Sequence, residues 1–432
     1  MHPKLLIVGT VPYNRQLSSR AFESYFKNWE KENLAQIFSN PKEPIKGHCG
    51  TLYQITDKRM LDRYFKSKID TGVVYNYNEL KDSIKQNTIP SRNIYSKLYG
   101  IGSRKSPSIY LLRKILWKKK YWCTEKLNTW LDSFNPECVF LAFSDDFFIL
   151  DIALFVAERF NIPIVSCIGD DYYFNEHQSL SPLYHIYKKQ YKLLVDKVLK
   201  HGGSAAYIGD KIRDKYNEEF SLNGKTVYLS SELSRHEYRP INTEAPFVSY
   251  CGNIRLGRAE SLCYIASDFG KINKTYMIDV YSNETEDSFC RKLKEHPNIR
   301  YHGSIPYEEV KNVMERSDIL LIVEGFEKKD VEITRYSLST KVADSLAIGG
   351  AVLTLGSIEC GAIEYMHQIN CGPVCTSVNC LESEIRNLLF NQKYQRENYD
   401  RSIMVTNMNH SLAKSNKVFE SIVVEAINNY KK

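Results

Sequence analysis

The chain has 432 residues, of which 43% are hydrophobic and 25% charged, and its formal net charge is +7. This length exceeds what one hydrophobic core usually organises, so we expect a globular protein with two domains. The longest apolar runs, such as VFLAF at 139–143, are too short to cross a bilayer. The first apolar run is also too short for a secretory signal, so we expect a cytoplasmic protein.

Short apolar runs alternate with longer amphipathic stretches through the first half of the chain. Strands are expected at 4–10, 34–39, 138–144, 162–169 and 204–209, and helices at 18–31, 121–135, 147–161, 181–202 and 210–220. Strands separated by helices indicate βαβ units and a parallel sheet covered on both faces. The polar region 68–107 is harder to assign, and we expect a partly irregular loop there.

A polar, proline-containing segment at 230–246 is the best candidate for a domain linker. The alternation restarts after it. Strands are expected at 247–253, 276–282, 299–305 and 318–324, helices at 258–273, 285–296 and 306–317, and a helix followed by a strand at 336–355. A last helix is expected at 415–432.

These patterns predict an α/β protein with two Rossmann-like domains that face each other across a cleft. The first domain would span residues 1–235, the second 246–412, and a closing helix 413–432. In open α/β sheets, ligands bind beyond the carboxyl ends of the strands, so the residues at these ends are candidate site residues.

One such strand end contains Gly252 and Asn253, and Arg258 follows at a helix start. A glycine lets the backbone approach a ligand, and a helix N-terminus with an arginine suits a phosphate group. A turn glycine and a surface arginine are the alternative.

Another strand ends at Gly303, Ser304 and Ile305. Their backbone groups could read the flat edge of a nucleobase, although a plain strand-to-helix turn is the simpler explanation.

The stretch YSLSTKVADSLAIGGAVLTL at 336–355 carries the most informative pattern. Ser337, Ser339 and Thr340 lie where hydroxyls cap a helix start. Capping does not explain Lys341, whose cation lies at the unfavourable end of the helix dipole. A bound diphosphate would reverse that penalty. Asp344 lies three residues further on, on the same face, where a carboxylate could bind a ribose diol.

Glu364 follows the next strand and could contact a sugar hydroxyl or be a plain helix-surface acid. In the first half, Gly9, Thr10 and Arg20 lie in or after the loop that follows the first strand, and could line the cleft from the other side. The G-x-G-x-x-G pattern of dinucleotide sites is absent there.

Paired acids follow two strands of the first half, Asp145 with Asp146, and Asp170 with Asp171. Asp170 and Asp171 could bind sugar hydroxyls or act as acid/base groups, with helix capping as the alternative. The sequence shows no Ser-His-Asp order, no P-loop and no H-E-x-x-H, which disfavours hydrolases and kinases.

The eleven cysteines form no repeating frame, which favours free thiols that pack as small hydrophobic side chains. One group, His367, Cys371, Cys375 and Cys380, needs weighing as a metal site. Zinc sites favour tighter C-x2-C pairs, so we expect no metal there.

Residues 104–120 contain seven lysines and arginines and no acid. This stretch is either a solvated helix face or a basic surface that contacts anionic lipid headgroups. Nucleic acid is a weaker option, since no nucleic-acid-binding motif accompanies the charge.

Taken together, YCGNIRLGR, YHGSIPYEEV, SDILLIVE and SLSTKVADSLAIGGAVL resemble motifs of bacterial GT-B glycosyltransferases of the retaining, GT4-like type. The segments at 7–38, 161–171 and 205–220 resemble acceptor-domain segments of surface-polysaccharide members of that family. The resemblance covers nearly the whole chain, and the order of the motifs is more specific than any one of them.

The resemblance implies a hexosyltransferase-like enzyme of capsule or O-antigen type polysaccharide biosynthesis. A UDP- or GDP-type sugar donor would bind the C-terminal domain, and a saccharide acceptor, carried on a lipid, the N-terminal domain. The closing helix would pack back on the N-terminal domain. Transfer would retain configuration and need no metal and no cofactor, and the basic stretch 104–120 would contact the inner membrane face.

The resemblance also assigns roles to residues. Arg258 and Lys341 would stabilise the departing diphosphate. Asp344 falls where the family has its ribose-binding glutamate, and Tyr336 where it has another glutamate. Asp170 and Asp171 replace a histidine that the family has in its cleft.

Two alternatives stay open. A nucleotide-sugar epimerase on the same fold would need well-placed carboxylates and histidines, and few histidines lie near the candidate residues. A non-catalytic GT-B subunit that scaffolds a partner enzyme is compatible with the altered glutamate pair.

Overall fold

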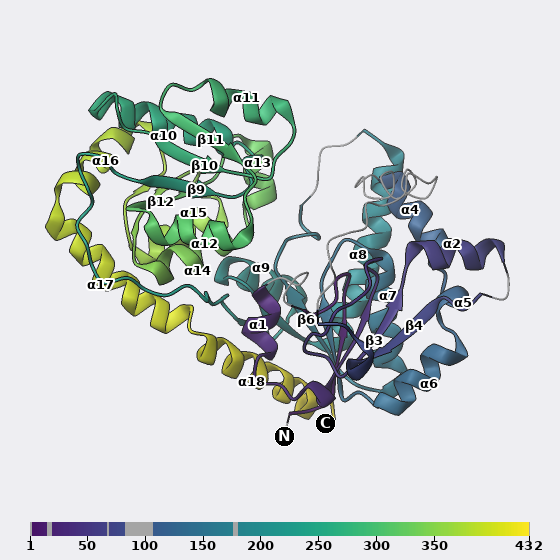
Figure 1. Ribbon diagram of the computed structural model, residues 1–432. Helices are drawn as coiled ribbons and strands as arrows, with labels where there is room; N and C mark the ends of the chain where they lie inside the picture. The colour runs from purple at the N-terminus through teal and green to yellow at the C-terminus, as the bar shows by residue number, and fades with distance from the viewer. Residues whose placement is uncertain (1, 15–19, 67–68, 83–106, 176–179, 432) are drawn as a thin grey trace. The chain divides into compact units, whose positions relative to one another are not determined.

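The computed structural model describes residues 2–14, 20–66, 69–82, 107–175 and 180–431. Residues 83–106, which make up most of the region 68–107 expected to be a partly irregular loop, lie outside the described residues. Arg104 and Lys105 of the basic stretch belong to this part of the chain. The chain divides into two compact units, Met1–Val227 with Asn416–Lys432, and Tyr228–Ser415 (Figure 1).

The first unit is built on an eight-stranded sheet with the order β4-β3-β2-β1-β5-β6-β7-β8. All of its pairings are parallel except that of β3 with β4. The antiparallel β4 corrects the expectation of a purely parallel sheet. The strands are β1 (Leu5–Val8), β2 (Leu34–Phe38), β3 (Thr51–Ile55), β4 (Gly72–Asn76), β5 (Cys138–Ala142), β6 (Ile164–Ile168), β7 (Ser204–Tyr207) and β8 (Lys225–Thr226).

The helices of the first unit begin and end at local signals. Thr56 and Thr124 cap two of them by accepting hydrogen bonds from the backbone N–H groups of Arg59 and Leu127. The helices are α1 (Arg20–Phe26), α2 (Asp57–Phe65), α4 (Pro107–Leu116), α5 (Lys119–Trp122), α6 (Glu125–Phe134), α7 (Phe147–Phe160), α8 (Pro182–Gly202) and α9 (Asp210–Phe220), with short 3-10 turns at Lys31–Asn33 and Tyr77–Glu79.

The C-terminal helix α18 (Leu412–Tyr430) belongs to the core of the first unit, as expected. Phe419 is fully buried there. The centroid of its ring lies 4.9 Å from the ring centroid of Tyr25 and 5.5 Å from that of Phe140. The Asn416 side chain donates hydrogen bonds to the carbonyls of Glu23 and Ser24. Helices α1 and α18 therefore lie side by side on one face of the sheet (Figure 1).

The second unit contains a six-stranded, all-parallel sheet with the order β11-β10-β9-β12-β13-β14. Its first strand, β9, lies in the middle, with β10 on one side and β12 on the other. The strands are β9 (Val248–Cys251), β10 (Ile278–Tyr281), β11 (Ile299–Gly303), β12 (Ile319–Val323), β13 (Ala351–Leu355) and β14 (Val374–Cys375).

The helices of the second unit connect these strands and cover both faces. The helix α13 lies in the part of the chain between 325 and 335 that the sequence pattern left unassigned. The helices are α10 (Arg258–Ile272), α11 (Asp287–Glu295), α12 (Tyr307–Arg316), α13 (Lys328–Thr334), α14 (Thr340–Ile348), α15 (Gly361–Ile369), α16 (Leu381–Phe390) and α17 (Gln392–Asn409), with a 3-10 turn at Val378–Cys380.

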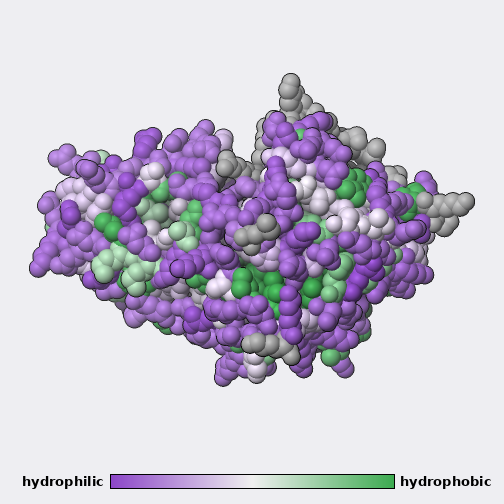
Figure 2. Space-filling view, turned by 90° about the horizontal axis from the view of Figure 1, so that it is seen from below, coloured by the Kyte–Doolittle hydropathy of each residue, from purple (hydrophilic) through white to green (hydrophobic). Residues whose placement is uncertain are grey.

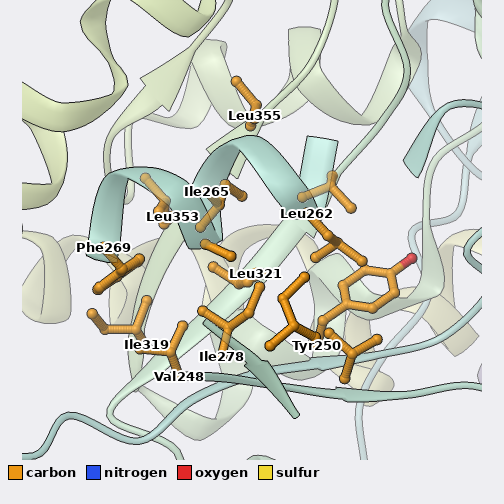
Figure 3. Close-up of a cluster of buried hydrophobic side chains, with 14 of the residues drawn as sticks. Val248, Tyr250, Leu262, Ile265, Phe269, Ile278, Ile319, Leu321, Leu353 and Leu355 are labelled. Carbon is orange, nitrogen blue, oxygen red and sulfur yellow. The ribbon is translucent and has the colours of Figure 1, made fainter. Parts of the chain in front are cut away.

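The core of the second unit lies between α10 and the sheet (Figure 3). Leu262, Ile265 and Phe269 recur at helical spacing on α10 and are fully buried. They pack on alternate residues of the central strands, among them Val248 and Ile278. The strand ends, and with them the candidate site residues, are held in place by this core.

Within the described ranges, no helix is both long and apolar enough to cross a membrane. Most of the surface in Figure 2 is hydrophilic, with apolar residues gathered in small areas.

We predict that Phe419→Ala destabilises the first unit by about 3–5 kcal/mol, because the buried ring leaves a cavity among aromatic neighbours. Val424→Ala, on the same helix but 40% exposed, is the matched control and should cost less than about 1 kcal/mol. Chemical denaturation of the two variants measures the difference, and equal losses would refute the packing of α18.

Candidate functional site

The candidate site lies where the strand order of the second sheet reverses, at the carboxyl ends of β9 and β12. Ligands of open α/β sheets bind at such switch points. The backbone pairing of β9 with β12 involves only Val248 with Ile319 and Ser249 with Leu320. Gly252 and Asn253 follow β9 directly, and Glu324 and Gly325 follow β12.

Lys341 reaches this strand end from the start of α14. Its ammonium lies 4.9 Å from the centre of the Tyr250 ring. A methyl group on Gly252 would lie 2.6 Å from Lys341 Nζ, so the absence of a side chain at Gly252 makes room for the ammonium. The φ angle of Gly252 is +155°, and the close approach therefore depends on glycine.

The start of α14 is capped as the sequence predicts. Ser339 is the N-cap residue, and its hydroxyl accepts a hydrogen bond of 3.4 Å from the backbone N–H of Lys341. Thr340, the first helical residue, is exposed. No carboxylate of the described residues forms an ion pair with Lys341. The N-terminal end of the helix dipole and the lysine thus offer two positive charges in one place, which suits an anion.

Arg258 lies at the first turn of α10 and is engaged by Glu324, at the end of β12. Its Nε and Nη2 atoms each donate a hydrogen bond of 3.0 Å to the Glu324 carboxylate. Both side chains are largely buried, at 13% and 5% exposure. The guanidinium is therefore held in one orientation by a two-pronged ion pair.

Sequence reasoning missed Glu324. It was assigned only as the last residue of a strand, DILLIVE, because its partner lies 66 positions earlier in the chain. A lone acid at the end of a buried strand was the signal that could have found it, since a charge in such a place needs a partner.

Two glycines bring the two sides of the switch point together. A methyl group on Gly257 would lie 2.7 Å from the Cα atom of Gly325, so the backbones after β9 and β12 are in contact there. Leu256 has a φ of +59°, which is uncommon for a residue with a side chain. This tight turn places Arg258 next to the end of β12.

Arg255, which precedes the helix, is occupied elsewhere. Its guanidinium forms ion pairs with Glu284 and Glu286. The hydrogen bond from Arg255 lowers the pKa of the Glu284 carboxyl to about 2.

The remaining candidate donor-side residues are placed differently. Gly303 ends the edge strand β11 with a φ of +73° and open space beside it, and Ser304 is exposed. Ile305 is half-buried. These residues share the carboxyl edge with Gly252 but lie two strands away from it.

Asp344 is buried, at 2% exposure, and accepts a hydrogen bond of 2.7 Å from the Ser231 hydroxyl. His410 lies in the same environment, and burial lowers its pKa against the opposing effect of the Leu229 carbonyl and of Asp344. Glu364 lies in the first turn of α15 and is half-buried, as is Tyr336.

The first unit has a switch point of its own, between β1 and β5, and Gly9 and Thr10 lie there. The Thr10 carbonyl accepts hydrogen bonds from the backbone N–H groups of Ser39 and Asn40. Arg20 is the first residue of α1.

The acids at other strand ends of the first unit are engaged by the protein itself. Asp171 Oδ1 accepts hydrogen bonds from the backbone N–H groups of Tyr173 and Phe174 and from the Tyr216 hydroxyl. These contacts stabilise the turn that follows β6. The next described helix, α8, begins only at Pro182, so they are not the helix cap considered as the alternative. Asp170 is exposed.

Asp145 and Asp146 follow β5 and contact α4. The Tyr110 hydroxyl donates to Asp145, and Arg113 forms ion pairs with Asp146 and Asp57.

The cysteines are all free thiols. The described part of the chain contains no group of three or more His, Cys, Asp or Glu residues that could hold a metal ion.

No protein-family model matches this chain, and no curated protein matches it either. Solved structures match it along its length. HepE from Anabaena, in complex with UDP, has a TM-score of 0.57 and 10% identity, and the match covers 98% of this chain and 100% of that chain. Sucrose-phosphate synthase from Thermosynechococcus elongatus has a TM-score of 0.54 and 10% identity, over 99% and 98%.

A glycosyltransferase from Rickettsia africae matches with a TM-score of 0.54 and 12% identity, over 99% of each chain. At this level of identity the likeness concerns the fold. The chain thus has the GT-B fold, with two Rossmann-like units.

We predict that Glu324→Ala lowers the free energy of unfolding by about 3–5 kcal/mol, because it leaves the Arg258 charge buried without a partner. Glu308→Ala removes an acid that is 79% exposed and pairs with Lys311, and it should cost less than about 1 kcal/mol. Adding Arg258→Met to Glu324→Ala should restore part of the loss. A double variant less stable than Glu324→Ala would contradict the ion-pair assignment.

Proposed function

We propose that the protein is a glycosyltransferase that transfers a sugar from a nucleotide-sugar donor to a saccharide acceptor. The observation that carries the proposal is the Lys341 ammonium at the N-terminus of α14, packed against Gly252 at the switch point of the second sheet. A cation and a helix N-terminus together fit the diphosphate of such a donor.

The donor nucleotide we propose is of the UDP type. The solved structures of HepE contain UDP, UDP with glucose, and UDP-glucose. Those ligands belong to HepE, and the likeness of fold supports the same class of ligand here. The strand end at Gly303, Ser304 and Ile305 would contact the base.

In the proposed reaction, the bond between the anomeric carbon and the diphosphate oxygen breaks. The acceptor hydroxyl oxygen bonds to the anomeric carbon from the same face, so configuration is retained, and its proton passes to the departing diphosphate. Lys341 and the α14 N-terminus stabilise the negative charge that develops on the leaving group. Arg258 would add to this field from its fixed position beside Glu324. The proposal includes no metal ion and no other cofactor.

Asp344 and Glu364 keep the roles expected from the sequence, contacts with ribose and with a sugar hydroxyl. A ribose contact by Asp344 stays a prediction, since its carboxylate is buried and already accepts the Ser231 hydrogen bond. On the acceptor side, the proposal includes Gly9, Thr10, Arg20, Asp170 and Asp171.

The acceptor we propose is a saccharide carried on a lipid, in the synthesis of a cell-surface polysaccharide of capsule or O-antigen type. The protein would then work in the cytoplasm at the inner face of the membrane. This part of the proposal rests on the resemblance of the first-half segments to acceptor domains.

The proposal is tested by a panel of UDP-, GDP- and dTDP-sugars, with thermal unfolding as the first measurement. A donor present at a hundred times its Kd should add about 2.7 kcal/mol of stability. The absence of a response to every nucleotide sugar would refute the proposal. Conversion of the donor without any acceptor would indicate an epimerase instead, and binding without turnover a non-catalytic subunit.

We predict that Lys341→Ala raises the Kd for UDP by about ten- to a hundredfold, because charge-assisted hydrogen bonds contribute about 1.5–3 kcal/mol. The stability of the unliganded protein should stay the same or rise slightly, because the lysine lies at the unfavourable end of the helix dipole. Lys393→Ala, which removes an exposed lysine of the same unit, is the control. Calorimetric titration with UDP measures the effect, and an unchanged Kd would exclude Lys341 from the phosphate site.

Gly252→Ala should also weaken UDP binding, since the added methyl group takes the place of the Lys341 ammonium. Adding Lys341→Arg to Gly252→Ala should not restore the affinity for UDP. The longer arginine side chain needs the same space beside residue 252 that the added methyl group fills. Titration of Gly252→Ala with UDP that gives the wild-type Kd would show that the ammonium can bind the ligand from another position.

A further inference from the structure

Two helices of the first unit, α4 and α8, lie side by side (Figure 1). The rings of Tyr110 and Tyr187 stack between them, with centroids 4.8 Å apart. Lys114 Nζ donates a hydrogen bond of 2.8 Å to Gln190 Oε1. These contacts fix the two helices against each other, so residues on their outer sides form one surface.

Five large apolar side chains of these helices are exposed to solvent, each between 46% and 64%. They are spaced three apart on α4, and three and seven apart on α8, so each set lies on one stripe of its helix. We call this surface the α4–α8 face, and its apolar residues are Leu112, Ile115, Leu183, Ile186 and Leu193.

The stripe on α8 is separate from the side that packs into the protein. The buried side of α8 is formed by apolar and aromatic residues and one lysine, namely Tyr184, Tyr187, Lys188, Tyr191, Val195, Val198 and Leu199. The helix thus has one apolar side in the core and a second toward solvent. Single exposed leucines are ordinary, but a row of five on adjacent helices marks an interaction surface.

Positive charge is concentrated on the same helices. Residues 107–122 contain five lysines and arginines and no acid, and residues 182–202 contain five lysines and one acid. The whole chain has a formal net charge of only +7, so the rest of it is net negative. Lys118 and Lys189 are exposed beside the apolar residues.

We propose that the α4–α8 face docks on an anionic lipid bilayer. Acyl chains would take up the apolar stripe, and lipid phosphates would pair with the lysines around it. The proposal extends the contact expected for residues 104–120 to α8, which that expectation did not include. It rests on exposure and charge and does not depend on glycosyl transfer.

Two other occupants fit the face less well. A second copy of the chain would bring two faces of the same positive sign together, which is repulsive. Nucleic acid would pair with the lysines, but it offers nothing that the five apolar side chains could be buried against, and the tyrosines of these helices lie on the buried side.

The test is sedimentation of the full-length protein with vesicles, without nucleotide. One set of vesicles mixes phosphatidylglycerol with phosphatidylcholine, and the other is phosphatidylcholine alone. The wild-type protein should bind only the anionic vesicles, and less at high salt. Each lysine near an anionic surface contributes a factor of about five to the partition coefficient, so Lys118→Gln with Lys189→Gln should weaken binding about twenty-five-fold.

The apolar contribution is tested by Ile186→Gln with Leu193→Gln, which keeps the charge and should also weaken binding at least tenfold. The matched controls lie in the second unit. Lys274→Gln with Lys393→Gln removes the same charge, and Met404→Gln with Met408→Gln changes two exposed apolar residues of α17. Both control variants should bind anionic vesicles like the wild type.

Three results would overturn the proposal. The first is a lack of vesicle binding, or binding that neither pair of face substitutions weakens. The second is a dimer in solution that the same substitutions dissociate, and the third is oligonucleotide binding that they abolish while vesicle binding persists. Because all substituted residues are exposed, every variant should unfold at the same temperature as the wild-type protein. Failure of the UDP titrations would leave these measurements unaffected, so the two proposals can fail separately.

Discussion

The ion pair between Arg258 and Glu324 is the interaction on which the candidate site depends. Strands β9 and β12 pair through only two residues each, near their amino ends. Beyond these residues the strands no longer share backbone hydrogen bonds, and the carboxyl ends need another connection. The two-pronged ion pair and the contact of Gly257 with Gly325 provide it. Both charged side chains are buried, so a buried charge without its partner would destabilise the fold. This penalty keeps Arg258 and Glu324 paired.

This connection leaves Lys341 in a different position from Arg258. The charge of Arg258 is neutralised by Glu324, whereas the Lys341 side chain is half-buried beside Gly252 and the Tyr250 ring. A cation at a helix N-terminus costs about 0.3–1 kcal/mol, and the ring contact offsets a similar amount. The two contributions to the stability of the protein are therefore close to balanced, and the proposed diphosphate would add a favourable one. In the proposed reaction, Arg258 would act on the diphosphate through its field, from the orientation that Glu324 sets.

The sequence predicted the alternation of strands and helices and the start of α14, because these depend on local patterns. Ser339 caps α14 as expected, since capping involves residues two positions apart. Glu324 escaped prediction because its partner lies 66 positions away. The burial of Asp344 was equally hidden, because Ser231 reaches it from a segment assigned only as a linker. Asp171 shows another local role, because its carboxylate accepts hydrogen bonds from the backbone two and three positions further on and so stabilises a turn instead of capping a helix.

The two positively charged features of the chain differ in their physics, and this difference separates their roles. Lys341 is half-buried beside a helix terminus, and it would bind a phosphate over one hydrogen-bond length, so dissolved salt would screen it little. The lysines of the α4–α8 face are spread over two helices and act through water, where the Debye length at 0.1 M salt is about 10 Å. A ligand held by the first should tolerate salt, and a surface held by the second should release as salt rises. The apolar stripe then decides how much contact remains once the charges are screened, because the burial of apolar side chains does not depend on charge.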